Sequence, residues 1–324
     1  MALLPSILLL CVGLVLLVVA GDFLVRGAAA LARHWGVPAL IVGLTIVAFG
    51  TSAPELVVSI GAVRDGVGQL AAGNVVGSNI ANVLLALGLP AMIMAIPTNM
   101  SGVARNTLVS VIATIMLIGL AFLHNPFVWW QGAILFSGIV LYLGWMGLLA
   151  RAGVDETILE EMSEIDEGRS GLPKNVMLDL VYVIGGLTGL FFGGELIVGN
   201  AVTLAQGIGV SEAVIGLTIV AIGTSLPEIA TVVIASLRGQ SEVAIGNILG
   251  SNIFNIFAVM GAASLVGPVQ LDPSLFAFDF WVMLAATLAL LVFVLRRRPI
   301  GRKTGIVFIL AYIFYILALV RGIL

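Results

Sequence analysis

The chain has 324 residues, of which 60% are hydrophobic and only 10% are charged, and its net charge is −3. A soluble globular protein carries about 25% charged residues, so this composition excludes that class and indicates a membrane protein. No basic face with interleaved aromatic residues suggests a nucleic-acid partner. The one cysteine, Cys11, excludes an internal disulfide.

Apolar segments long enough to cross a bilayer as helices follow one another along the chain. We predict ten of them, at about 5–32, 38–63, 70–96, 105–123, 127–149, 176–205, 211–237, 243–267, 277–295 and 304–322. The first lacks the basic start of a signal peptide and has a longer apolar run, so we expect it to be a retained helix. The sequence therefore predicts an all-α integral membrane protein.

One hydrophilic, acidic segment, 151–175, interrupts the apolar pattern. It separates a first five-helix repeat, 1–150, from a second, 176–324. Its acidic residues do not have the spacing of an EF-hand, so we interpret it as a solvated linker.

Two sequence motifs occur once in each half. GLTIVAFGTSAPE at 43–55 returns as GLTIVAIGTSLPE at 216–228, and GNVVGSNIAN at 73–82 returns as GNILGSNIFN at 246–255, always 173 residues later. Because each half has an odd number of spans, the second enters the membrane from the opposite side and the repeats are inverted. Inverted repeats hold their site near the bilayer midplane and support alternating access.

Lysine and arginine placement predicts the orientation. If the connections alternate between the two sides, one side receives eleven basic residues, including Arg296–Arg298, and the other receives only Arg64 and Arg321. The basic side is expected to be cytoplasmic. The linker 151–175 is then cytoplasmic and both termini are outside a plasma membrane, which for a bacterium is the inner membrane.

The first motif places a glutamate, Glu55 or Glu228, within an apolar segment. A charge in the middle of a bilayer costs at least about 2.5–3.5 kcal/mol, so these carboxylates are expected to be functional. Residues three, four and seven positions before each glutamate share its helical face; they are Ser52, Thr51 and Ala48, and Ser225, Thr224 and Ala221. Pro54 and Pro227 are expected to open the helix and free backbone carbonyls.

The second motif adds neutral oxygen donors. Its candidates are Ser78, Asn82, Ser251 and Asn255, accompanied by Asn74, Asn79, Asn247 and Asn252. No histidine or cysteine lies among them, and an all-oxygen set selects Na⁺, Ca²⁺ or Mg²⁺ over zinc or copper. Ca²⁺ accepts about 6–8 oxygens in flexible geometry, whereas Mg²⁺ keeps its water, so Mg²⁺ ranks lower.

A further acidic pair, Asp22 and Glu195, is also 173 residues apart. These residues could form a gate or an accessory cation ligand. We favour a structural role, in which Asp22 pairs with Arg26 one helical turn later.

Both motif pairs resemble the two α-repeats of the Ca²⁺/cation antiporter superfamily, which includes the sodium/calcium exchangers, and above all its bacterial members. The resemblance covers essentially the whole chain. It implies ten helices in two inverted repeats, with the second, third, seventh and eighth around the site and the first and sixth lying across the bundle, where they slide.

The resemblance also implies residue roles. Glu55 and Glu228 would bind Ca²⁺ or Na⁺ at the centre, and Thr51 and Thr224 would contribute hydroxyl and backbone oxygens. The carbonyls of Ala48 and Ala221 would join them, and Ser52 and Ser225 would line the Na⁺ positions. The serines of the second motif map to Ser78 and Ser251, and its last residues to Asn82 and Asn255. Several family members carry Asp at the position of Asn255, so this asparagine argues against K⁺ co-transport.

We predict an antiporter, not an enzyme, that exchanges Na⁺ for Ca²⁺ independently of K⁺, with three Na⁺ per Ca²⁺ implied by the resemblance. We expect no cofactor and no obligate protein partner; the partners are the two ions and the lipid bilayer. The first alternative is H⁺/Ca²⁺ exchange, because buried glutamates can carry protons. An intramembrane hydrolase with paired carboxylates and a passive channel are the remaining alternatives.

Overall fold

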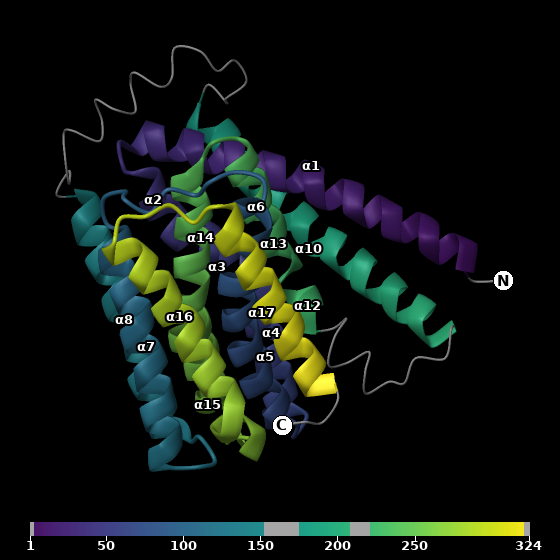
Figure 1. Ribbon diagram of the computed structural model, residues 1–324, viewed down its shortest axis with the longest axis vertical. Coiled ribbons are helices and arrows are strands. Elements are labelled where there is room, and N and C mark those ends of the chain that lie inside the picture. The colour runs from purple at the N-terminus through teal and green to yellow at the C-terminus, as the bar shows by residue number, and fades with distance from the viewer. Residues whose placement is uncertain (1–2, 152–174, 208–220, 321–324) are drawn as a thin grey trace.

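The computed structural model describes residues 3–151, 175–207 and 221–320. These residues form helices and connecting segments (Figure 1). Two isolated β-bridges, Ile96 with Ile300 and Phe127 with Val269, join connections of the first half to connections of the second. The all-α fold is as predicted.

The first half contains the longest helix and a helix broken near its middle. Its elements are α1 (Leu3–Trp35), α2 (Ala39–Val42), the π-helical η1 (Gly43–Val47), α3 (Ala48–Thr51), α4 (Ala53–Arg64), α5 (Gly68–Ala81), the π-helical η2 (Asn82–Ala86), α6 (Gly88–Ala91), α7 (Val103–Leu123) and α8 (Trp129–Arg151).

The described elements of the second half follow a similar order. They are α10 (Val176–Gly207), α12 (Ala221–Thr224), α13 (Leu226–Leu237), α14 (Ser241–Phe254), the π-helical η5 (Asn255–Met260), α15 (Gly261–Val266), the π-helical η6 (Leu275–Asp279), α16 (Phe280–Leu295) and α17 (Arg302–Val320).

The helices match the predicted spans. Eight helices of the described chain are long and apolar enough to cross a membrane, and the bent helix from α2 to α4 makes a ninth. The predicted span 211–237 lies partly outside the described residues, and its described part is α12 and α13. Most of the linker 151–175 also lies outside the described residues.

The π-helical turns were not predicted. Two of them, η2 and η5, begin at Asn82 and Asn255, the last residues of the second motif in each half. π-Helical turns are rare in proteins, but those that occur are often at functional sites. Such a turn changes which backbone carbonyls accept a helical hydrogen bond. Neither position has a proline beside it, and hydrophobic periodicity does not distinguish a π-helical turn from an α-helical one.

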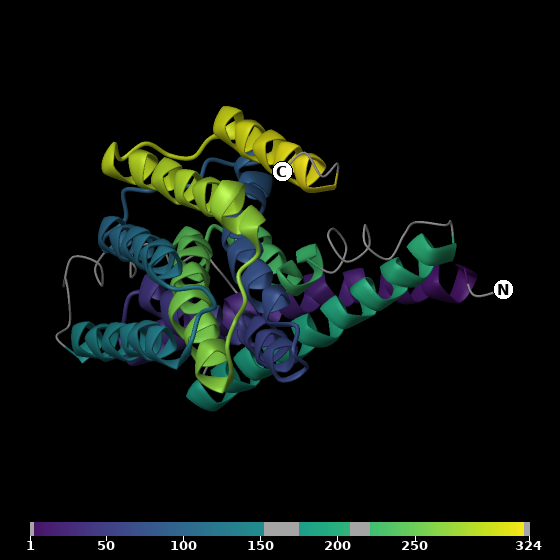
Figure 2. The same ribbon diagram turned by 90° about the horizontal axis from the view of Figure 1, so that it is seen from below.

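The helices α1 and α10 lie side by side and run obliquely to the rest of the bundle (Figures 1 and 2). Small residues permit this close contact. A Cβ added at Gly186 would lie 2.6 Å from the backbone nitrogen of Leu24, and one added at Gly189 would lie 2.6 Å from the Cβ of Ala20. Small residues are the usual means by which membrane helices approach each other closely.

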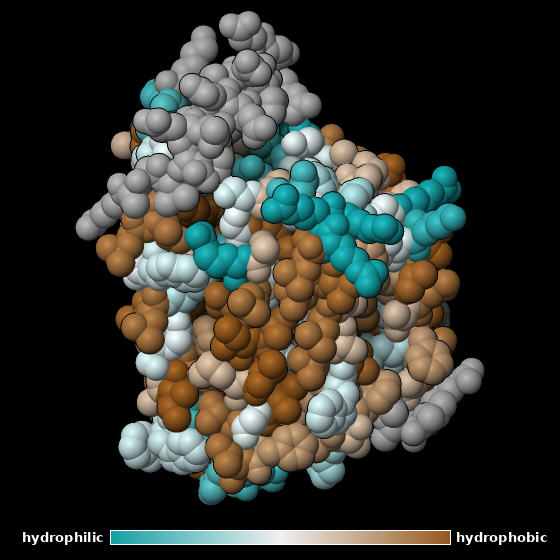
Figure 3. Space-filling view, turned by 60° about the vertical axis from the view of Figure 1, so that its left-hand side comes forward, coloured by the Kyte–Doolittle hydropathy of each residue, from teal (hydrophilic) through white to brown (hydrophobic). Residues whose placement is uncertain are grey.

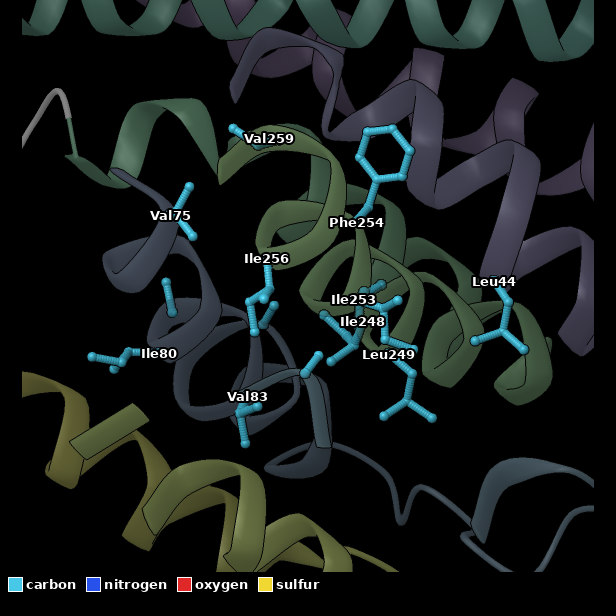
Figure 4. Packing of buried hydrophobic residues seen from close by; sticks show 14 of the residues in the cluster. Leu44, Val75, Ile80, Val83, Ile248, Leu249, Ile253, Phe254, Ile256 and Val259 are labelled. Atoms are coloured by element: carbon cyan, nitrogen blue, oxygen red, sulfur yellow. The ribbon is translucent and has the colours of Figure 1, made fainter. Parts of the chain in front are cut away.

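The helix α14 lies at the centre of the bundle and is buried from Val243 to Phe254. Its Ile248, Leu249 and Ile253 belong to one hydrophobic cluster, which also contains Leu44 of η1 and Val83 of η2 (Figure 4). Many large apolar side chains remain exposed on the outer helices. They form a hydrophobic surface with hydrophilic residues gathered toward its ends (Figure 3), as a bilayer requires.

Candidate cation site

Each first motif contains a helix break. Ser52 separates α3 from α4 with φ −88° and ψ 5°, and Ser225 separates α12 from α13 with φ −87° and ψ 1°. In the first half the two segments are bent by 42°. Pro54 and Pro227 lie at the start of the following helices and have no N–H to donate. The break predicted from these prolines is therefore present in both halves.

The carbonyl of Ala48 does not lose its partner at this break. It accepts hydrogen bonds from the backbone N–H of Ser52, at 3.0 Å, and from the hydroxyl of Thr51, at 3.4 Å. The equivalent Ala221 is the first described residue of α12. Pro54 has no N–H, so it cannot donate the helical hydrogen bond to the carbonyl of Gly50, four residues earlier.

The two glutamates lie at the centre of the protein, in the first turns of α4 and α13. Glu55 and Glu228 are both fully buried, and their charges lie close enough to interact. The hydroxyl of Ser52 donates to Oε1 of Glu228 at 2.9 Å, which joins the two halves. A helix N-terminus favours negative charge because of its unpaired N–H groups and its dipole, so both breaks stabilise the carboxylates.

The break of each half contacts the second motif of the other half. Thr51 donates to Oδ1 of Asn247 at 3.1 Å, and its hydroxyl lies 3.5 Å from that of Ser251. In the inverse arrangement, Thr224 donates to Oδ1 of Asn74 at 3.2 Å. Ser225 donates to the hydroxyl of Ser78, also at 3.2 Å. Helix contacts between the repeats thus bring four motifs to one place.

Asparagines of the two second motifs also meet between the halves. Asn82 donates to Oδ1 of Asn252 at 3.0 Å. Asn255 is fully buried, and neither its Oδ1 nor its Nδ2 has a hydrogen-bond partner among the described residues. Both asparagines lie where a π-helical turn begins, and their own backbone dihedrals are those of an α-helix.

Several buried oxygens at this site accept no hydrogen bond from the described protein. They are Oε1 and Oε2 of Glu55, Oε2 of Glu228, Oδ1 of Asn82 and Oδ1 of Asn255. Burying a polar oxygen without a partner costs free energy, and burying two carboxylates costs far more. A hard cation would satisfy such oxygens directly. No group of three His, Cys, Asp or Glu side chains that could hold a metal occurs among the described residues, so neutral oxygens would have to complete the ligand set.

Hydrogen bonds between the halves bring several predicted residues together, namely Thr51, Ser52, Ser78, Thr224, Ser225, Glu228 and Ser251, and they add others. Asn74 and Asn247 belong to the second motif but were not ranked as site residues, although they accept the threonine hydroxyls. Ser59 was missed: it is buried and accepts a hydrogen bond from Nδ2 of Asn74 at 3.1 Å. The repeat signalled the two asparagines, whereas Ser59 has no serine counterpart in the second half.

The second acidic pair lies apart from this site. Oδ2 of Asp22 forms an ion pair with Nε of Arg26 at 2.9 Å, and its Oδ1 forms an ion pair with Arg238 at the end of α13. The ion pair between Asp22 and Arg26 confirms the predicted pairing of these two residues. Glu195 is exposed on α10.

Comparison with known proteins gives concordant matches. The family model described as sodium/calcium exchanger protein matches residues 5–148 and 178–321. The chain is 40% identical to CaxA of Alkalimonas amylolytica over 309 residues, which are 94% of this chain and 95% of that protein. It is 30% identical to the sodium/calcium exchanger MaX1 of Methanosarcina acetivorans over 97% of this chain and 98% of that one.

A solved structure of the sodium-calcium exchanger NCX_Mj, soaked with Na⁺ and Ca²⁺, has the same fold. It superposes with a TM-score of 0.82 at 31% sequence identity and covers 97% of this chain and 98% of that chain. The match extends over both halves, so the arrangement of the whole bundle is shared.

Proposed function

Because the chain belongs to the sodium/calcium exchanger family, we propose that it exchanges Na⁺ for Ca²⁺ across the membrane by alternating access. The family and the fold are those of a transporter rather than of an enzyme. The observation that carries the proposal is the pair of fully buried carboxylates, Glu55 and Glu228, because three of their four carboxylate oxygens have no hydrogen-bond partner among the described residues.

The two cations would share these carboxylates. Ca²⁺ or Na⁺ would neutralise Glu55 and Glu228, with hydroxyls of Thr51 and Ser52 from one half and of Ser251 from the other nearby. Because overlapping sites exclude simultaneous binding, the flux of one cation is coupled to that of the other. The empty, doubly negative site resists exposure to the membrane interior, so only the loaded site changes its access.

We propose that transport is independent of K⁺. Asn255 is a neutral amide at a position where several family members carry a carboxylate, and it is buried at the start of η5, which packs against α4. Without that third charge, the site supplies two formal negative charges, which match one Ca²⁺. The proposal implies no cofactor.

We also propose that the end of the bundle carrying Arg296–Arg298 faces the cytoplasm. Arg33 at the end of α1 and Arg238 at the end of α13 belong to the same predicted side. Positive charge is retained on the cytoplasmic side of membrane proteins. Both termini would then lie on the opposite side.

The alternative is exchange of Ca²⁺ for protons. It is favoured by one observation, that both carboxylate oxygens of Glu55 lack a partner among the described residues and could take up a proton instead of Na⁺. The two functions use the same residues and differ only in the ion that returns.

Flux measurements would decide between them. The purified protein is reconstituted into liposomes, and the liposomes are loaded with ⁴⁵Ca²⁺. A Na⁺, K⁺ or H⁺ gradient is then imposed separately. We expect a Na⁺ gradient alone to drive ⁴⁵Ca²⁺ movement, and a K⁺ gradient to have no effect. Movement driven by a pH gradient but not by Na⁺ would replace this proposal with proton exchange, and flux without any counter-ion would indicate a channel.

A further inference from the structure

A cavity of about 240 Å³ is lined by residues of the candidate cation site and by residues that precede α16. Its inner wall includes Asn74, Ser78 and Thr224, which belong to the cross-repeat hydrogen bonds of that site. Its outer wall includes Asp272 and Asp279. These aspartates precede α16, whereas the basic residues Arg296–Arg298 follow it, so the cavity lies toward the end opposite the basic connection.

Asp279 lies deep in this cavity. It ends η6, is only 5% exposed, and its Oδ1 accepts a hydrogen bond from the hydroxyl of Tyr315 at 3.0 Å. Asp272 is close enough for the two charges to interact, and its own Oδ1 accepts from the backbone N–H of Ser274. Two carboxylates therefore line one cavity.

The first repeat contains the same contact without the charge. Asn106 and Tyr142 are the residues 173 positions earlier, and the hydroxyl of Tyr142 donates to Oδ1 of Asn106 at 3.1 Å. An amide is therefore sufficient for the tyrosine hydrogen bond in this fold. A buried carboxylate costs more to bury than an amide, so the charge of Asp279 requires a reason other than this hydrogen bond.

We propose that this cavity is the access route for Ca²⁺ from one side of the membrane, and that Asp279, with Asp272, captures the divalent cation before it reaches Glu55 and Glu228. The inference rests on the proposed function. A cleft lined by charge of one sign raises the local concentration of the opposite ion by about 10- to 1,000-fold. Paired carboxylates are hard oxygen ligands that suit Ca²⁺.

The test uses Asp279→Asn, which reproduces the residue of the first repeat and keeps the hydrogen bond to Tyr315. Initial ⁴⁵Ca²⁺ transport is measured against Ca²⁺ concentration in right-side-out and in everted membrane vesicles, which present opposite faces to the bath. We expect the half-saturating Ca²⁺ concentration to rise by about tenfold at one face only. An unchanged value at both faces, or an equal rise at both, would overturn the proposal.

Two controls separate the charge from the contact. Tyr315→Phe removes the hydrogen bond but keeps the carboxylate, so it should transport like the unmodified protein; a shift as large as that of Asp279→Asn would assign the effect to structure and overturn the proposal. Glu195→Gln removes an exposed carboxylate on α10 and should change neither face.

A binding measurement keeps this proposal distinct from the exchange function. The double variant Glu55→Gln/Glu228→Gln lacks the central charges, and equilibrium dialysis with ⁴⁵Ca²⁺ should still detect weak binding. Adding Asp279→Asn should reduce that binding by about tenfold. Absence of any binding in the double variant would overturn the capture site, whereas absence of Ca²⁺ exchange in the unmodified protein would overturn only the proposed function.

Discussion

At the scale of single residues, the protein is defined by polar atoms that are buried without protein partners. Glu55, Glu228 and Asn255 are all fully buried, and each has at least one oxygen that accepts no hydrogen bond from the described residues. A stable protein rarely retains several such atoms in one place. Their concentration between the repeats is the physical reason to expect a bound cation.

The carboxylates can be tested by neutral replacements of nearly the same shape. We expect Glu55→Gln and Glu228→Gln to reduce Na⁺-driven ⁴⁵Ca²⁺ uptake into liposomes by at least about tenfold, because a contact to a charged group contributes about 1.5–3 kcal/mol. Glu195→Gln is the matched control, since this glutamate is exposed. Normal uptake by either central variant would refute the site.

Asn255 tests the origin of ion preference. We expect Asn255→Asp to add a third carboxylate next to the central pair and so to change the Na⁺ dependence of Ca²⁺ transport or introduce a K⁺ requirement. Uptake of ⁴⁵Ca²⁺ would be measured at several Na⁺ and K⁺ concentrations. Asn252→Asp is a useful comparison, because Asn252 is buried nearby but already accepts a hydrogen bond from Asn82. Identical ion dependence in Asn255→Asp and in the unmodified protein would contradict this role.

At the scale of helices, the site depends on how closely α14 approaches the broken helix of the first half. A Cβ added at Gly246 would lie 2.8 Å from the carbonyl oxygen of Leu40, and one added at Gly250 would lie 2.5 Å from that of Leu44. Because these neighbours are backbone atoms, they cannot move aside without moving a helix. The glycines therefore set the distance at which Asn247 and Ser251 reach Thr51.

Gly250→Ala should separate α14 from η1. Overpacking of this kind costs about 1–3 kcal/mol, so we expect a lower unfolding temperature in detergent and weaker ⁴⁵Ca²⁺ uptake. The control is Gly119→Ala in α7, where an added Cβ meets no described atom within 4 Å. There, alanine should be neutral or slightly stabilising because it favours helix. Equal thermal stability of the two variants would contradict this close packing.

At the scale of the whole molecule, neither half contains a complete site. Ser52 of the first half donates to Glu228 of the second, and Ser225 of the second donates to Ser78 of the first. The oblique pair α1 and α10 also joins the halves along its length (Figure 2). A cation held between Glu55 and Glu228 would therefore connect the two repeats and stabilise the folded protein as a whole.

This connection predicts stabilisation by Ca²⁺. A ligand that binds only the folded state at 100 times its dissociation constant adds about 2.7 kcal/mol, so we expect saturating Ca²⁺ to raise the unfolding temperature of the purified protein. Mg²⁺ should have a smaller effect because it keeps its water. Glu228→Gln should lose most of the increase, and Glu195→Gln should keep it. An increase that persists in Glu228→Gln would show that Ca²⁺ acts elsewhere.

The sequence alone determined the membrane class, the helical spans, the inverted repeat, the helix breaks and the two central glutamates. These features can be read from short stretches of sequence: the length of each apolar segment, the number of spans in each half, and the chemistry of proline and of a buried charge. The repeat shows each of them twice. Only the tertiary structure decided that each break contacts the opposite half's second motif and that π-helical turns begin at Asn82 and Asn255. It also decided that Asp279 lines the same cavity as Asn74, Ser78 and Thr224 of the site. These features arise from contacts between segments far apart in the chain, and Asp279 has no acidic counterpart that the repeat could reveal.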